Sequence, residues 1–127
     1  MKKPTSVILL VAIAIVLAVA PPARAHHATN QFDMDKTITL SGTVKEFQWT
    51  NPHTWIQVLV TNADAATEEW SAEMAAPANL SRQGWKKDSL KPGDKVTVTL
   101  HPLKNGDKGG IVTSVLGPDG QPIVKPQ

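Results

Sequence analysis

Four histidines are the residues of this sequence whose type and spacing best suit chemistry. His26 and His27 are adjacent near the N-terminus, and His53 and His101 stand singly farther along. A neutral imidazole offers a nitrogen ligand to zinc, copper, iron or nickel. The chain contains no cysteine, so a lipoprotein anchor, disulfides and thiolate ligands are excluded, and the mature protein must fold and bind through other groups.

The adjacent histidines directly follow a predicted signal-peptidase site. Two lysines open the chain, residues 7–20 are uninterruptedly apolar, and Ala23 and Ala25 supply small residues at positions −3 and −1. The apolar run is shorter than the roughly 20 residues that a membrane-spanning helix needs. We therefore expect a signal peptide over residues 1–25, cleavage after Ala25, no membrane anchor afterwards, and a periplasmic or secreted location.

Cleavage after Ala25 would make His26 the first residue of the mature chain. Its α-amine and ring nitrogen can then chelate one metal ion, and a third nitrogen from another imidazole completes a histidine brace. Nitrogen ligands in tetragonal geometry favour copper. We expect His53 to supply the third nitrogen, because Pro52 stiffens its approach. His101 is the next candidate, and His27 is too close in sequence to His26 to complete the same small chelate.

Other interpretations of the same residues remain open. Asp33 or Asp35 could add an oxygen ligand or orient a metal ligand. His26 and His27 could equally belong to a leader without a ligand, and His53 could simply begin the next strand. The sequence therefore predicts a candidate site and leaves its occupancy open.

Charge and motif content exclude several functions. Removing residues 1–25 takes away three of the 13 basic residues, which leaves 10 against 11 acidic residues and a formal charge of −1. The basic patch that nucleic-acid binding requires is missing, so we expect no nucleic-acid partner. Hydrolase, zinc-protease, phosphate-loop and dinucleotide motifs are also missing, so we expect no hydrolase or transferase activity and no enzyme of these classes. A copper redox enzyme stays open as a third alternative, since a histidine brace can activate oxygen.

Apolar and polar residues alternate through most of the mature chain, which is the period of β-strands. A flip of this alternation near residues 45–46 predicts a β-bulge. Pro77 and Gly84 bracket a short predicted helix, and Val58 is expected in the core. The predicted strands cover residues 37–49, 53–61 and 68–74, a stretch through Val96, Val98 and Leu100, and residues 111–116.

Three strands, a helix and two more strands are the order of an OB-fold, a five-stranded Greek-key barrel with a small helix. The alternative is a small β-sandwich. We expect a leader over residues 26–36, the barrel over 37–117 and a flexible tail over 118–127. In OB-folds the first and fourth interstrand loops, here residues 50–53 and 102–108, rim the usual binding face.

Two groups of side chains receive structural interpretations. Glu68, Glu69 and Glu73 all fall in one predicted strand, which indicates solvated side chains on a strand face and not an acid–base pair. The tryptophans are expected to supply core volume, because the chain lacks tyrosine and has two phenylalanines. They are Trp49, Trp55, Trp70 and Trp85.

Several short motifs are spread over almost the whole mature chain: HH at 26–27, FD at 32–33, GTV at 42–44, WTNPH at 49–53, GW at 84–85 and KPGD at 91–94. With these motifs the chain resembles a family of short exported bacterial proteins that carry a domain-of-unknown-function label. The resemblance implies export and a small β-rich fold, and it assigns no activity. His101 and Pro102 depart from the pattern of that family.

The sequence thus predicts a small exported binding protein of one of two kinds. The first binds copper through His26 and His53. The second is a metal-free OB-like module that binds an exported protein, a peptide or a small ligand through its loop rim. No partner is specified more closely by the residues.

Overall fold

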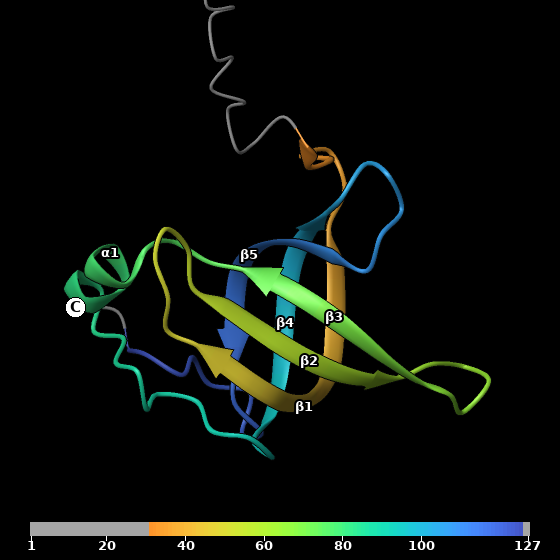
Figure 1. Cartoon of the computed structure of the whole chain (residues 1–127). Coiled ribbons are helices and arrows are strands. Elements are labelled where there is room, and N and C mark those ends of the chain that lie inside the picture. The colour runs from red at the N-terminus through yellow and green to blue at the C-terminus, as the bar shows by residue number, and fades with distance from the viewer. Residues whose placement is uncertain (1–30, 126–127) are drawn as a thin grey trace, which may run out of the picture.

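The computed structural model describes residues 31–125, which form five strands and one short helix in the predicted order (Figure 1). The predicted signal peptide, the cleavage site, His26 and His27 lie outside these residues. The elements are β1 (Ile38–Gln48), β2 (Trp55–Thr61), β3 (Thr67–Glu73), α1 (Pro77–Arg82), β4 (Lys95–Pro102) and β5 (Gly109–Leu116).

The five strands form a closed barrel with the neighbour order β1-β2-β3-β5-β4. Strand β1 closes the barrel because it pairs with both β2 and β4, and β3 with β5 is the one parallel pair among the named strands. This confirms the predicted OB-fold. The alternative of a sandwich is wrong because a single sheet closes on itself.

The length and curvature of β1 allow it to close the barrel. Its N-terminal half pairs with β4 and its C-terminal half with β2. The register with β2 shifts between Val44 and Glu46, which makes Lys45 the extra residue and confirms the predicted bulge. Gly42 lies so close to the carbonyl of Leu59 on β2 that a Cβ at this position would collide with it. The bend therefore depends on a glycine.

Side chains from every strand fill the barrel. Val58, Val98 and Leu100 are each 0% exposed, which confirms the predicted core position of Val58. Complete burial of one such side chain contributes roughly 1.5–3 kcal/mol. Trp85 is buried in this core, and Trp49 and Trp70 pack against it, as expected.

Helix α1 packs beside the barrel through Leu80, which is 3% exposed. Pro77 occupies its first turn, where a missing N–H removes no helical hydrogen bond. The helix ends before Gly84, which adopts a φ of +96° that other residues rarely accept. No helix in the described part of the chain has the length and apolar character to span a membrane.

Both ends of the described chain are held on the barrel. Phe32 is 1% exposed and pairs with Leu103, and Lys104 N donates to Gln31 O at 2.9 Å. Figure 1 shows this orange segment beside the blue loop between β4 and β5. At the other end, Ile123 N donates to Val115 O at 3.2 Å. Ile123, which falls within the predicted flexible tail, also packs against the core.

Candidate functional site

His53 lies at the end of the β1–β2 loop, where it meets Glu73 at the end of β3. The register of the β2–β3 hairpin places Trp55 opposite Glu73, so a residue just before β2 lies beside this carboxylate. The Nδ1 atom of His53 is 2.5 Å from Oε1 of Glu73. Thr50 Oγ1 also donates to His53 O at 2.8 Å. The backbone and the ring of His53 are both held in place.

Glu73 is a buried acid, and its side chain is 7% exposed against 36% for that of His53. The interpretation of Glu73 as part of a solvated strand face is therefore wrong. It has outward parity, but the chain around His53 folds over this end of β3, with Thr54 N donating to Ala75 O. Glu69 does match the interpretation, because its side chain is 43% exposed and pairs with Lys45 at 2.7 Å.

The electrostatics of the pair follow from this burial. Loss of hydration raises the pKa of the Glu73 carboxyl above its ordinary value, and the nearby His53 partly opposes that rise. A carboxylate accepts hydrogen bonds, so Nδ1–H of His53 is the donor. The lone pair of a neutral His53 ring is then on Nε2, which is the nitrogen available to an external ligand or metal ion.

His101 is held in a comparable way at the end of β4. Its Nδ1 is 2.7 Å from the carbonyl oxygen of Lys36. A carbonyl can only accept, so Nδ1 donates and Nε2 of His101 also carries the free lone pair. The sequence did not indicate this contact, since Lys36 and His101 are far apart along the chain.

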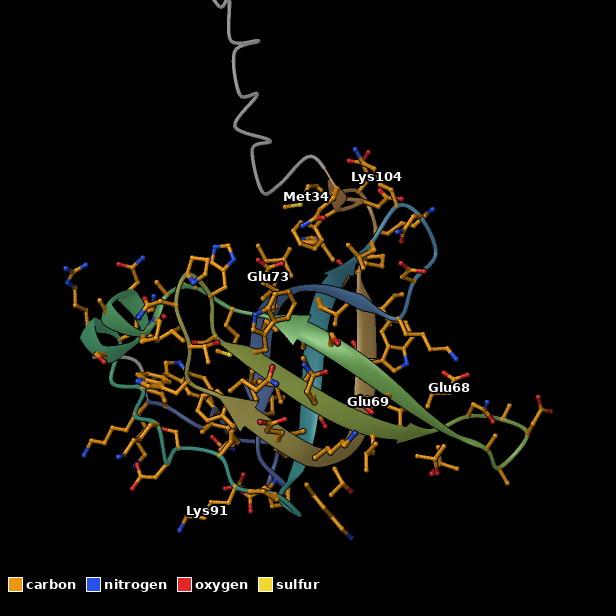
Figure 2. All side chains as sticks on the ribbon, in the orientation of Figure 1. Met34, Glu68, Glu69, Glu73, Lys91 and Lys104 are labelled. Atoms are coloured by element: carbon orange, nitrogen blue, oxygen red, sulfur yellow. The ribbon has the colours of Figure 1, made fainter. Side chains whose placement is uncertain are left out.

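Glu73, the partner of His53, and His101 lie along one row on the outer face of the barrel. Glu73 pairs with Ile111 on β5, and Ile111 pairs with His101 on β4. At about 4.8 Å between neighbouring strands, the Cα atoms of Glu73 and His101 are about 10 Å apart. Figure 2 shows Glu73 near the end of β3, at the same end of the barrel as Met34 and Lys104.

Asp33 and Asp35, the predicted oxygen ligands, make contacts within their own turn. Asp33 forms an ion pair with Lys36 at 2.9 Å, and the hydrogen bond from Lys36 holds the Asp33 pKa below its ordinary value. The backbone N–H of Asp35 also donates to Asp33 Oδ1 at 3.3 Å. Within residues 31–125, no three histidine, aspartate or glutamate side chains come together in a metal-binding arrangement.

The outer face of β1, β2 and β3 carries a chain of polar contacts. Ser71 Oγ donates to Gln57 Oε1 at 2.7 Å, and Gln57 Nε2 donates to Gln48 Oε1 at 3.1 Å. Trp55 lies on the same face and is half-buried, so it departs from the expectation that every tryptophan is in the core. The face also carries Glu46 next to these residues.

Sequence reasoning missed Glu73 as a partner of His53. The signal lies in the hairpin: the loop between β2 and β3 covers residues 62–66, with Thr61 opposite Thr67. Counting back along both strands from that pair places Trp55 opposite Glu73. Alternation alone assigns Glu73 to the outer face and carries no information on what covers it there.

A closed barrel with this strand order, and with a histidine–glutamate pair on its rim, defines the chain as an OB-fold protein with a candidate binding rim. The chain belongs to the family of unknown function DUF6152, whose sequence model matches residues 13–113. This membership confirms the resemblance to a domain-of-unknown-function family. No curated protein matches the chain.

Solved structures with a similar fold include two crystal forms of the mitochondrial single-stranded DNA binding protein Rim1 from S. cerevisiae. Form 2 has a TM-score of 0.50 and 9% identity, and the match covers 65% of this chain and 93% of Rim1. Form 1 has a TM-score of 0.50 and 8% identity, with 65% and 92% covered. At these identities the likeness shows the fold alone, and the expected absence of a nucleic-acid partner stays a prediction.

Proposed function

We propose that this chain is an exported binding protein whose ligand is copper. In the mature chain, the α-amine and ring of His26 would chelate the ion, and Nε2 of His53 would supply the third nitrogen. The observation that carries the proposal is the contact between Glu73 Oε1 and Nδ1 of His53. Histidines that bind metals in proteins usually donate their other ring N–H to such an oxygen.

The Glu73 contact favours metal binding in two ways. It fixes the ring orientation and the tautomer of His53, and its negative charge stabilises the positive charge of a metal ion bound at Nε2. The contact also lowers the stability of the fold, because burial of a carboxylate costs folding free energy unless the group is well paired. The raised pKa of Glu73 reflects that cost. Glu73 lies beside His53, a potential metal ligand, although its burial lowers stability. This combination supports a functional role for Glu73.

The position of the leader supports a contribution from His26. Gln31 is fixed beside the β4–β5 loop by Lys104 N, and His26 precedes it by five residues. Five extended residues span at most about 17 Å, which exceeds the separation of about 10 Å between the Cα atoms of Glu73 and His101 across two strand spacings. The described residues provide no group of three suitable donors, so a complete site requires donors from outside residues 31–125.

Titration of the mature protein with cupric ion, against a competing chelator, tests the proposal. Three variants are compared: one residue added ahead of His26, His53→Ala and His27→Ala. We expect the first two to weaken binding by at least about tenfold, since even the loss of a residue that only orients a ligand costs that much. His27→Ala should have little effect. Binding should weaken below neutral pH, because protons compete for an amine of pKa about 8 and an imidazole of about 6.5.

The same titration defines the contrary result. Equal affinity in all variants, or binding no tighter than that of a peptide spanning residues 26–35, would contradict a folded copper site. The intact mass of the secreted protein provides the second check, because a chain that starts elsewhere than His26 lacks the chelate.

One observation favours a metal-free second candidate. Trp55 and the chain from Gln48 through Gln57 to Ser71 present an aromatic ring and hydrogen-bonding groups on the face that binds ligands in many OB-folds. A peptide or small polar ligand exported to the same compartment would fit this chemistry. Loss of its binding in Trp55→Ala, with copper affinity retained, would distinguish this function from the first.

A further inference from the structure

Met34 is the one exposed large hydrophobic residue among residues 31–125, at 49% exposure. The other methionine of this part, Met74, is buried at 8% exposure in the core. A thioether is a soft and polarizable group, so an exposed one is available to a soft metal ion. Met34 also lies in the segment that connects the leader to the barrel.

The turn that carries Met34 is fixed at both ends to the end of β4. Asp33 N donates to Pro102 O at 2.8 Å, and the carbonyl of Lys36 accepts from Nδ1 of His101 at 2.7 Å. Lys36 N also donates to Asp33 O at 3.1 Å, which closes the turn. The first and last Cα atoms of such a turn lie within about 7 Å of each other. Met34 therefore lies inside a turn whose last carbonyl, that of Lys36, contacts the His101 ring.

The thioether of Met34 is a softer ligand than the nitrogens of the proposed His26 and His53 site. Nitrogen ligands in tetragonal geometry suit Cu(II), whereas thioether ligands select Cu(I). His101 presents Nε2 because its Nδ1 is used by Lys36. The turn from Asp33 to Lys36 thus brings Met34, which carries a thioether, close along the backbone to the imidazole of His101.

We infer that Met34 and His101 form a soft ligand pair that binds Cu(I). The inference rests on the proposed function for the identity of the metal, and it deepens that function: the protein binds copper in both oxidation states, with different side chains dominating in each. Histidine nitrogens of the leader and rim hold Cu(II), and Met34 contributes to the affinity for Cu(I) alone.

Parallel measurement of Cu(I) and Cu(II) affinities tests this inference. Cu(I) is titrated anaerobically against bicinchoninate, and Cu(II) is titrated in air. Met34→Leu keeps the side-chain volume and removes the sulfur. We expect it to lower the Cu(I) affinity by at least about tenfold, in line with the cost of disturbing a metal ligand, and to leave the Cu(II) affinity unchanged. Met74→Leu is the matched control and should change neither affinity.

The outcomes separate this inference from the proposed function. Cu(I) affinity that depends on Met34, with no Cu(II) binding that depends on His26, supports the soft pair and overturns the brace. Cu(II) binding that depends on His26, with equal Cu(I) affinity in wild type and Met34→Leu, overturns the soft pair. Absence of binding in both oxidation states overturns both. X-ray absorption of the Cu(I) form should show a sulfur neighbour that Met34→Leu removes.

Discussion

Glu73 Oε1 lies 2.5 Å from Nδ1 of His53, and it is the buried partner of the two. This contact links the β1–β2 loop to the end of β3 and determines which nitrogen of a neutral His53 carries the free lone pair. Glu73 has opposite effects on folding and on metal binding. The carboxylate costs folding free energy because it is buried, and it increases the ligand strength of the histidine that it contacts.

Glu73→Gln should therefore weaken copper binding without weakening the fold. The amide oxygen can still accept the His53 hydrogen bond, but the negative charge that strengthens Nε2 is lost. We expect an affinity lower by about tenfold. Since the pKa of Glu73 is raised, its contribution to stability is present below its unfolded pKa and is lost as pH rises through the folded value. At neutral pH the variant should be at least as stable as wild type.

Glu69→Gln is the matched control for this change. Glu69 lies on the same strand but is exposed and paired with Lys45. Titration calorimetry and urea unfolding at neutral pH measure both effects. A large loss of stability in Glu73→Gln with unchanged affinity would show that Glu73 is a structural residue only.

We expect no appreciable affinity for single-stranded DNA, although the fold is similar to that of Rim1. Glu46, Glu69 and Glu73 lie on the outer face of β1 to β3, and Trp55 is the one tryptophan there. Binding of single strands without sequence preference combines a positive groove with several stacking aromatics. Fluorescence anisotropy with an oligothymidine should give a Kd weaker than about 10⁻⁴ M at physiological salt. Micromolar binding that weakens with added salt would refute this expectation, and Rim1 is the positive control.

Much of this fold could be predicted from the sequence, because apolar and polar residues alternate through most of the strands. The bulge at Lys45 and the helix between Pro77 and Gly84 were also predicted, since each has a local signal in residue type. The pairing of His53 with Glu73 depends on the hairpin register. The apolar alternation fixes which residues face inward, but Asn, Asp and alanine at residues 62–66 leave the loop bounds open by a residue or two.

The contact of His101 with Lys36 is harder to predict from the sequence than the pairing of His53 with Glu73. It arises when β1 closes the barrel against β4 and brings together residues that are 65 positions apart. Phe32 is a related case: it is buried, but its partner Leu103 comes from the distant β4–β5 loop. Contacts of this kind form when the barrel closes, and no local pattern of residue types in the sequence indicates them.

Thr54→Val should stabilise the protein. Thr54 is 0% exposed, and its Oγ1 has no hydrogen-bond partner among the described residues. A buried hydroxyl without a partner costs about 1–3 kcal/mol, and valine has the same shape without it. We expect a gain of about 1 kcal/mol, which corresponds to a rise in Tm of roughly 4–8 °C for a domain of this size. Thermal unfolding followed by circular dichroism measures it, and a lower Tm would show that the hydroxyl is hydrogen-bonded in solution.

Acid should destabilise the fold through Glu68. The hydrogen bond from Asn62 holds its pKa below the ordinary value of 4.5, with further help from Trp70 and Lys108. A carboxyl with a lowered folded pKa contributes stability above its unfolded pKa and loses it as pH falls through the folded value. The free energy of unfolding should therefore decrease as pH drops below about 4.5. Urea unfolding over this range should show a shallower decrease for Glu68→Gln, and identical slopes would contradict the assignment.

The parallel pairing of β3 with β5 forms a short seam in the barrel. It joins the strands at three positions, Ser71 with Gly109, Ala72 with Gly110 and Glu73 with Ile111, whereas the β2–β3 hairpin is paired along its whole length. Local opening starts where the fewest hydrogen bonds must break. The amides of this seam should therefore exchange with deuterium fastest among the strands. A ligand that contacts both His53 and His101 bridges the seam, and by linkage it would slow that exchange.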